Sequence, residues 1–353
     1  MKNHTMRLAG ILMLSWVAST AHAQFAVTQL GAGTTATGIN STGQVTGWSA
    51  AGSFVTGANG VGMTLLGNPP GQGGVATPQG INDTGQVVGY FVTYSGVEHA
   101  FATGANGASM IDLGTLGGST SSAASINNSG KVVGFSSTNT PYVYHAFISS
   151  STGGMTDLGG SYAFGINAAG QVAGENAAGH AFLTGANGLG MVDLETLGGS
   201  SSEAYALNNS GEVVGYSTLA SGNNLEGFIT GPNGVGMRDL GTLGGSRSMP
   251  ASVNDSGVVV GWSWTASFEQ RAFITGANGV GMVDLNSLVT LPDGAILKNA
   301  TGINDAGQIT VNATDGQAYL LTASVPEPGA CGLLLFGLGL VGLVVRRKKQ
   351  DTN

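Results

Sequence analysis

The sequence predicts an all-β protein, a seven-bladed β-propeller in which an N-terminal strand closes the last blade. Three observations carry this prediction: a repeated phrase, four strand-like segments in each repeat, and complementary chain ends. The phrase recurs seven times, at steps of 42, 45, 40, 41, 46 and 50 residues, and a period near 44 is typical of four short strands per blade. The copies are INSTGQVTG (39–47), INDTGQVVG (81–89), INNSGKVVG (126–134), INAAGQVAG (166–174), LNNSGEVVG (207–215), VNDSGVVVG (253–261) and INDAGQITV (303–311).

Each repeat contains its four segments in a fixed order. The first ends in a phrase such as MIDLG (110–114), and the second is the run of small residues before the Asn, as at 123–127. Small side chains suit an innermost strand crowded around the axis. The third segment follows the turn, as at 86–90, and the fourth reads HAFAT (99–103) or similar. Turns such as NDSG (254–257) and GANG (57–60) supply the Asn, Asp and Gly that hairpins need.

The two chain ends are halves of one repeat. Residues 25–31 (FAVTQLG) align with the first segment, and residues 317–322 (QAYLLT) align with the fourth. Pairing them would close a ring and remove two exposed strand edges. A stacked solenoid is the alternative, but it would need dissimilar polar caps at its ends.

Composition narrows the class of function. Gly accounts for 62 of 353 residues, charged residues are only 8%, and the hydrophobic fraction of 42% can sustain a core. Residues 24–325 contain 5 basic and 17 acidic side chains, a net charge of −12, which argues against a nucleic-acid partner. The single cysteine, Cys331, lies outside the repeats, so they contain no disulfide. We expect no cofactor and no metal.

The N-terminal residues 1–23 have the features of a secretory signal peptide. Lys2 and Arg7 precede an apolar run at 8–18, and the small residues Ala21 and Ala23 predict cleavage after Ala23. A buried helix is the alternative interpretation. The propeller is therefore expected over residues 24–323, outside the cell.

The C-terminal residues combine a proline box, an apolar stretch and a basic end. The box is Val325, Pro326, Glu327 and Pro328 (with residue 324, the segment 324–328), and residues 329–345 are apolar enough to predict a transmembrane helix. The tail at 346–353 begins with Arg346, Arg347, Lys348 and Lys349, which should stay cytoplasmic.

This tail resembles the PEP-CTERM sorting signal of exopolysaccharide-producing Gram-negative bacteria. The resemblance covers about 25 residues and implies that a membrane-embedded exosortase recognises and removes the tail during export. The expected location is the cell envelope or extracellular matrix, reached through an inner-membrane intermediate. A membrane anchor that is never processed is the alternative.

The repeats resemble the HAF family of extracellular repeat proteins. The His-Ala-Phe triplet stands at 99–101, 145–147 and 180–182, and DLGTLGGS stands at 112–119 and 239–246. The histidine is replaced by Glu226, Arg271 and Gln317 in other repeats. The resemblance brings no established activity or ligand.

The repeated polar residues are better explained by architecture than by chemistry. His99, His145 and His180 occupy equivalent positions in successive repeats, and on non-inner strands they would lie too far apart to share one metal ion. A repeated aspartate precedes each Gly-rich turn, where it can accept backbone N–H bonds. These are Asp112, Asp157, Asp193, Asp239 and Asp284.

No catalytic group stands out from the repeats. Glu175, Glu203, Glu269 and Asp293 are non-repeated acids, and the sequence gives no reason to choose among them. Aromatic residues at or near the end of the third segment are candidates to stack on sugars, although packing within the blade also explains them. They are Trp48, Tyr90, Tyr216, Trp262 and Trp264.

The sequence therefore favours a non-enzymatic, exported protein of the envelope or biofilm matrix, whose propeller has a binding or structural role. Exopolysaccharide is one candidate ligand, and the identity of the ligand stays open. Two alternatives stay open: a propeller hydrolase or lyase that acts on extracellular polysaccharide, and a self-assembling surface protein.

Overall fold

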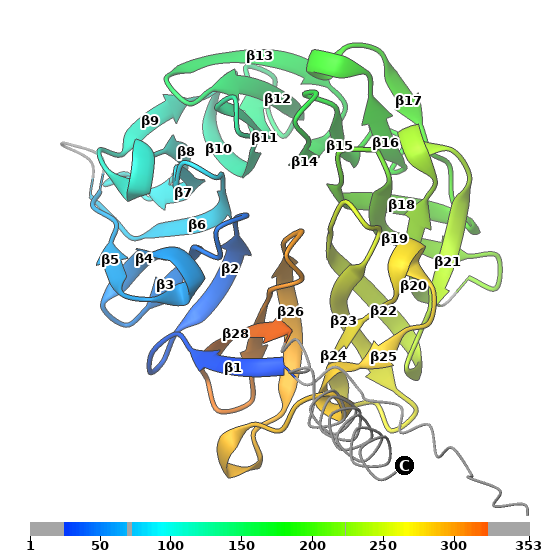
Figure 1. The fold of residues 1–353 in the computed structure, drawn as a ribbon. Helices are drawn as coiled ribbons and strands as arrows, with labels where there is room; N and C mark the ends of the chain where they lie inside the picture. The colour runs from blue at the N-terminus through cyan, green and yellow to red at the C-terminus, as the bar shows by residue number, and fades with distance from the viewer. Residues whose placement is uncertain (1–24, 69–72, 223, 324–353) are drawn as a thin grey trace, which may run out of the picture. The chain divides into compact units, whose positions relative to one another are not determined.

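Six β-sheets follow one another around a central axis (Figure 1). The computed structural model of the protein describes residues 25–68, 73–222 and 224–323. Within them, the strands are joined by turns and by 3-10 helices of three residues each. The predicted all-β propeller is therefore confirmed as a class of fold.

Three of the sheets are formed by the first three repeats, and each has four strands. The first contains β2 (Thr35–Ile39), β3 (Val45–Ser49), β4 (Gly52–Thr56) and β5 (Met63–Leu65). The second contains β6 (Ala76–Ile81), β7 (Val87–Val92), β8 (Glu98–Ala102) and β9 (Ile111–Gly114). The third contains β10 (Gly117–Ile126), β11 (Lys131–Thr138), β12 (Tyr144–Ser150) and β13 (Gly153–Gly159).

The remaining repeats form three more sheets. The fourth sheet contains β14 (Tyr162–Ile166), β15 (Val172–Glu175), β16 (Ala181–Thr184) and β17 (Met191–Asp193). The eight-stranded sheet contains β18 (Gly198–Leu207), β19 (Val213–Leu219), β20 (Leu225–Thr230), β21 (Met237–Gly241), β22 (Gly244–Val253), β23 (Val259–Thr265), β24 (Gln270–Ile274) and β25 (Val283–Asp284). The last sheet contains β26 (Leu297–Ile303), β27 (Ile309–Ala313), β28 (Ala318–Ala323) and β1 (Phe25–Gln29).

Short 3-10 helices lie in the hairpin loops and before the last repeat. They are η1 (Ala58–Gly60), η2 (Ala105–Gly107), η3 (Ala186–Gly188), η4 (Pro232–Gly234), η5 (Ala277–Gly279), η6 (Leu285–Ser287) and η7 (Pro292–Gly294).

The prediction of seven blades is wrong. The hydrogen bonds define five separate four-stranded blades and one eight-stranded sheet, which the fifth and sixth repeats share. The two repeats are joined by one parallel pairing, between Leu225 of β20 and Arg247 of β22. The physical reason is that strands in adjacent repeats approach closely enough there to pair across the boundary, which the repeat pattern alone does not reveal.

The predicted transmembrane helix falls on residues that the structure does not describe. Nowhere in the part of the chain that the structure describes is a helix long and apolar enough to cross a membrane. The predicted span at 329–345 lies outside the described residues, as do the predicted signal peptide and the sorting box.

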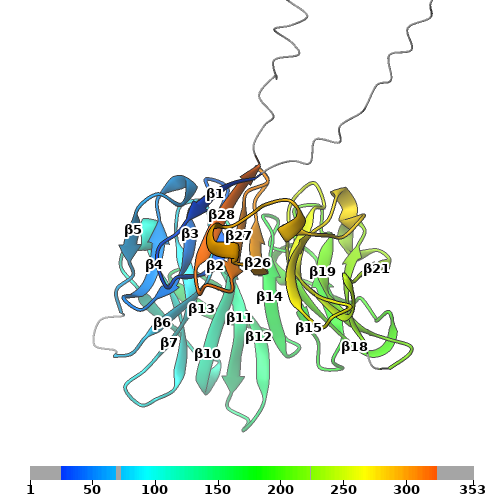
Figure 2. The same cartoon turned by 90° about the horizontal axis from the view of Figure 1, so that it is seen from below.

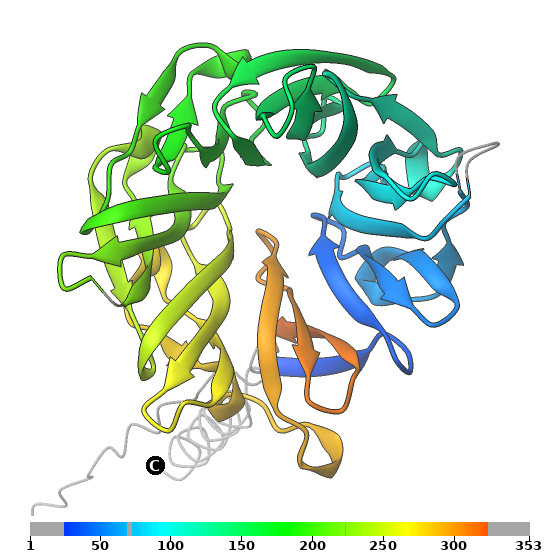
Figure 3. The same cartoon turned by 180° about the vertical axis from the view of Figure 1, so that it is seen from behind.

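The N-terminal strand does join the last sheet. β1 pairs antiparallel with β28, in register from Phe25 opposite Ala323 to Gln29 opposite Tyr319. The next residue, Leu30, donates its backbone N–H to the carbonyl of Ala318 at 3.0 Å and buries its side chain. Figure 3 shows the first and last strands of the propeller side by side. The predicted pairing of the two ends is confirmed.

A closed circle of asparagine side chains holds the innermost strands together. In every repeat, the Asn at the end of the inner strand donates from Nδ2 to the backbone carbonyl of the equivalent Asn in the next repeat, at 2.9–3.3 Å. The last of these bonds runs from Asn304 to Asn40. We call this set the asparagine ring; its members are Asn40, Asn82, Asn127, Asn167, Asn208, Asn254 and Asn304.

We expect Asn127→Ala to lower the free energy of unfolding by about 2–4 kcal/mol, because it leaves buried backbone groups unpaired. The Asn127 side chain donates to the carbonyl of Asn167 and accepts from the amides of Ser129 and Lys131. Asn128→Ala is the matched control, since the adjacent Asn128 is exposed and bonds only to Asp83 at the surface. Urea denaturation measures both. Equal losses for the two variants would contradict a structural role of the ring.

Glycine at the end of the repeated phrase is required by a bulge in each inner strand. A Cβ atom on Gly47, Gly89, Gly134, Gly174, Gly215 or Gly261 would lie 1.9–2.2 Å from a carbonyl oxygen of the inner strand. The inner strands shift register at this place, as between Ala204 and Ala206 of β18. In the seventh repeat Val311 replaces the glycine, and β26 has a second register shift, between Leu297 and Asn299.

Candidate functional site

One face of the propeller carries residues that differ from repeat to repeat. The inner strands end at the asparagine ring and begin at the opposite face, which we call the variable face; Figure 2 views the strands from the side, between these two faces. We call the glycine that ends the repeated phrase, opposite the bulge in the inner strand, the bulge glycine. On the variable face, the residue that follows it (or that follows Val311 in the seventh repeat) pairs with a residue of the inner strand. The seven cross-strand pairs are Trp48–Thr35, Tyr90–Thr77, Phe135–Ser122, Glu175–Tyr162, Tyr216–Glu203, Trp262–Met249 and Asn312–Asn299.

Six aromatic rings form a continuous cluster on this face, across the third, fourth and fifth repeats. Adjacent ring centroids lie 5.0–6.3 Å apart. Tyr144 and Tyr162 are stacked with an interplanar angle of 23°, and Tyr162 and Phe164 with one of 18°. We call this set the aromatic cluster; its members are Phe135, Tyr144, Tyr162, Phe164, Tyr205 and Tyr216.

Two glutamates lie within the aromatic cluster, and the negative charge of one of them acts on the other. Burial raises the pKa of Glu203, and the hydrogen bond that it accepts from the Tyr216 hydroxyl at 2.7 Å opposes this rise without cancelling it. Burial and, second, the negative charge of Glu203 raise the pKa of Glu175. We call Glu175 and Glu203 the carboxylate pair. Burial and the same carboxylates raise the pKa of Tyr205 and Tyr216, so both hydroxyls keep their protons at neutral pH.

A second aromatic group lies on the neighbouring repeat. The rings of Trp262 and Trp264 are 6.4 Å apart, and Phe268 packs edge-on against Trp264. The guanidinium carbon of Arg247 lies 5.1 Å from the Trp264 ring centroid, a cation–π contact. Phe268 is exposed and has a positive φ of 60°, so the loop presents its ring to solvent.

A cavity of about 330 Å³ lies between these two aromatic groups. Phe164, Tyr205 and Trp262 line it, together with Asn299. Among the described residues the Asn299 Oδ1 atom is buried and has no hydrogen-bond partner. A buried acceptor without a donor is unfavourable, so a donor that reached this oxygen would be stabilising.

The aromatic residues proposed from the sequence divide into two groups. Tyr216, Trp262 and Trp264 are brought together at this site. Trp48 and Tyr90 are not: their inner-strand partners are the threonines Thr35 and Thr77, and no ring contact with the aromatic cluster occurs within residues 25–68, 73–222 and 224–323.

Sequence reasoning missed most of the aromatic cluster and had no reason to choose Glu175 or Glu203. The signal was present, because these residues break a pattern that the other repeats keep. At the position after the bulge glycine, for example, Glu175 stands where five repeats have an aromatic residue. The other acids that the sequence offered lie elsewhere: Glu269 pairs with Arg271 at 2.7 Å, and Asp293 belongs to η7.

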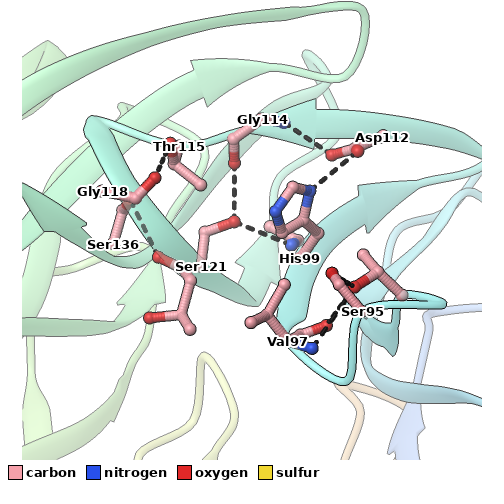
Figure 4. A network of polar contacts seen from close by, with 12 residues as sticks. Ser95, Val97, His99, Asp112, Gly114, Thr115, Gly118, Ser121 and Ser136 are labelled. Atoms are coloured by element: carbon pink, nitrogen blue, oxygen red, sulfur yellow. Dashed lines mark hydrogen bonds and ion pairs between the residues drawn. The ribbon is translucent and has the colours of Figure 1, made fainter.

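The three repeated histidines belong to a structural network (Figure 4). The Nδ1 atoms of His99, His145 and His180 lie 2.8, 2.7 and 2.9 Å from the carboxylates of Asp112, Asp157 and Asp193 in their own repeats. In the second repeat Asp112 also accepts from the amide of Gly114, whose carbonyl accepts from Ser121. No group of three or more ligands able to hold a metal ion occurs in the part of the chain that the structure describes.

The repeated aspartates have the role that their position predicts. Each accepts a backbone N–H two residues later, at 2.7–2.8 Å. In Asp157, burial acts to raise the pKa, but the hydrogen bonds from His145 and from the Gly159 amide outweigh it, so the pKa lies below the ordinary value. The His145–Asp157 pair therefore makes its full contribution to the free energy of unfolding above a pH of about 4, the ordinary aspartate value. That contribution is lost as the pH falls through the lower pKa of Asp157 in the folded state.

The fifth repeat lacks this pairing and offers a test of it. Glu226 stands in place of the histidine, and burial and, second, the negative charge of Asp239 raise the pKa of Glu226. Because the folded state disfavours the ionised form of a carboxyl group whose pKa is raised, the ionised Glu226 lowers the free energy of unfolding at neutral pH. Protonation of the group at low pH removes this loss. We expect Glu226→His to raise the free energy of unfolding at pH 7 by up to about 1 kcal/mol, with a smaller gain below pH 4. Thermal unfolding across pH checks this; a loss of stability at pH 7 would contradict it.

The comparisons with known proteins identify one motif. The PEP-CTERM protein-sorting motif matches residues 324–349. The motif indicates an exported protein that is sorted to the surface or matrix and processed by an exosortase-type enzyme. No curated protein matches the chain. The HAF resemblance is not shown by these comparisons and stays a prediction.

Similar solved structures share the fold alone. An oligogalacturonate lyase from Vibrio parahaemolyticus is 11% identical, with a TM-score of 0.55; the alignment covers 88% of this chain and 96% of that one. YCF48 bound to D1 peptide is 10% identical, with a TM-score of 0.50 and coverage of 86% and 97%. TolB from Acinetobacter baumannii is 13% identical, with a TM-score of 0.44; the alignment covers 68% of this chain and only 64% of that chain's length.

Proposed function

We propose that this exported protein is a non-enzymatic saccharide-binding propeller of the cell envelope or biofilm matrix, and that it binds exopolysaccharide at the variable face. The observation that carries the proposal is the aromatic cluster beside a cavity. The sorting motif supports the location, since it indicates delivery to the compartment where such polymers occur.

The chemistry of the variable face suits a sugar ring. Aromatic faces stack on the apolar C–H faces of sugars, and the polar groups at their edges bind hydroxyls. Around the cavity, Phe164, Tyr205 and Trp262 supply rings, while Asn299 supplies a free acceptor. Tyr144 extends the stacked rings toward solvent, where a polymer chain would continue.

Two neighbouring tyrosines give a matched test: Tyr142 lies in the turn before β12, and Tyr144 is the first residue of β12. Tyr144 is 36% exposed and contacts Phe135 and Tyr162, whereas Tyr142 is 99% exposed and takes no part in the described ring contacts. We expect Tyr144→Ala to weaken binding to the producing cell's exopolysaccharide by about tenfold, because a stacking ring contributes roughly 1–2 kcal/mol. Tyr142→Ala should bind as the unaltered protein does.

Binding of the exported protein to immobilised exopolysaccharide measures this. Equal binding by both variants would remove the aromatic cluster from the site. Absence of binding by the unaltered protein, to its own polymer and to a broad glycan panel, would contradict the proposed function itself.

A hydrolase or lyase that acts on the same polymer is the second candidate. The carboxylate pair favours it, because a carboxyl group with a raised pKa can serve as a general acid beside a second carboxylate. The test is release of oligosaccharides from the exopolysaccharide by the exported protein. Release that is abolished by Glu203→Gln, while binding is retained, would favour an enzyme over a binding protein.

A further inference from the structure

The carboxylate pair places negative charge at the variable face without a neutralising partner. The ion pairs within the described residues are three His–Asp pairs and Arg271–Glu269, and none includes Glu175 or Glu203. Arg247 stacks on Trp264, and its positive charge also acts on the Tyr216 hydroxyl. Within the described residues it forms no ion pair with either glutamate. Among the described residues, the only side-chain hydrogen bond to Glu203 comes from the neutral Tyr216 hydroxyl.

The rings around the carboxylate pair add to this negative potential. The π face of an aromatic ring attracts a cation, and such a contact contributes about 0.5–2 kcal/mol. Tyr162 lies opposite Glu175 and Tyr216 lies opposite Glu203 on paired strands. Burial is the main cause that raises the pKa of the Tyr162, Tyr205 and Tyr216 hydroxyls, and the negative charges of Glu175 and Glu203 raise it further. Carboxylates flanked by ring faces are a suitable environment for an ammonium group.

We propose that the variable face selects a saccharide with free amino groups, a cationic hexosamine polymer, and that the carboxylate pair binds its ammonium groups. This inference rests on the proposed saccharide-binding function and adds the charge of the ligand. The ammonium group would donate to Glu175 and Glu203 while the sugar ring stacks on the aromatic cluster. A polymer of uronic acids would be repelled, both by the carboxylate pair and by the net charge of −8 of the chain.

The experiment compares three β-1,4-linked hexasaccharides that differ at one substituent: glucosamine, N-acetylglucosamine and glucose. Calorimetric titration of the exported protein should give a dissociation constant at least about tenfold lower for the glucosamine hexamer than for the other two, the equivalent of about 1.4 kcal/mol. Glu175→Gln and Glu203→Gln should each remove most of that preference while the affinity for the glucose hexamer is retained.

Glu98→Gln is the matched control, since Glu98 is an exposed glutamate at the start of β8, outside the aromatic cluster. It should keep the full preference. Circular dichroism and melting confirm that each variant is folded, and two separate glutamine variants keep the test available if one of them is not.

Each outcome is decisive. Equal affinity for the amino and N-acetyl hexamers overturns the charge selection and leaves saccharide binding standing. A preference that Glu98→Gln reduces as much as Glu175→Gln overturns the assignment to the carboxylate pair. Failure to bind all three hexamers and the producing cell's own exopolysaccharide overturns both the inference and the proposed function.

Discussion

Deleting residues 25–30 is expected to lower the free energy of unfolding by at least about 4 kcal/mol. The deletion removes the five residue pairs between β1 and β28, and with them the buried side chain of Leu30. It also exposes the edge of β28, which then becomes a template for pairing with another chain. Urea denaturation and light scattering measure the two effects.

The control for this deletion keeps the strand and removes its outer side chains. Thr28 and Gln29 are exposed, so the double variant Thr28→Ala, Gln29→Ala should change stability by less than about 1 kcal/mol. A deletion variant that unfolds no earlier than this control would contradict the role of β1 in closing the ring.

Gly215→Ala is expected to lower the free energy of unfolding by about 3 kcal/mol or more and to weaken ligand binding. The new Cβ atom would lie 1.9 Å from the carbonyl oxygen of Glu203 and 2.8 Å from the Cα of Ala204, contacts that only a backbone shift can relieve. Because the shifted backbone carries Glu203, the carboxylate pair should be displaced as well. Thermal unfolding and saccharide titration measure the two losses.

Gly67→Ala is the matched control. Gly67 is exposed, and no atom lies within 4 Å of the position that its Cβ would take. The control should be as stable as the unaltered protein. A small loss for Gly215→Ala, comparable with that of the control, would show that the bulge can move and would contradict the stated reason for this glycine.

Much of the fold could be predicted because residue patterns within each repeat indicate where its strands and turns lie. The copies of the Asn phrase mark the hairpins, and the partial repeats at the two ends predict the pairing of β1 with β28. The sharing of one sheet by two repeats could not be predicted. It depends on the parallel approach of Leu225 and Arg247, which no residue pattern encodes.

The site was harder to predict because its members are far apart in sequence. Glu175 and Glu203 belong to consecutive repeats, and only the packing of β18 beside β15 brings them within reach of one another. The aromatic residues were partly visible, since Tyr216 and Trp262 directly follow the repeated phrases. Tyr162, Phe164 and Tyr205 lie on inner strands, where the other repeats mostly have small or polar residues, and only comparison of the repeats position by position would single them out.

Hydrogen–deuterium exchange of the exported protein, with and without oligosaccharides from the producing cell's matrix, tests the central claim most directly. We predict protection of β14 and β18, which carry Tyr162, Phe164, Glu203 and Tyr205, with no change at the exposed turns beside the asparagine ring. Protection confined to those turns, or absent from the whole variable face while the oligosaccharide is bound, would contradict the account.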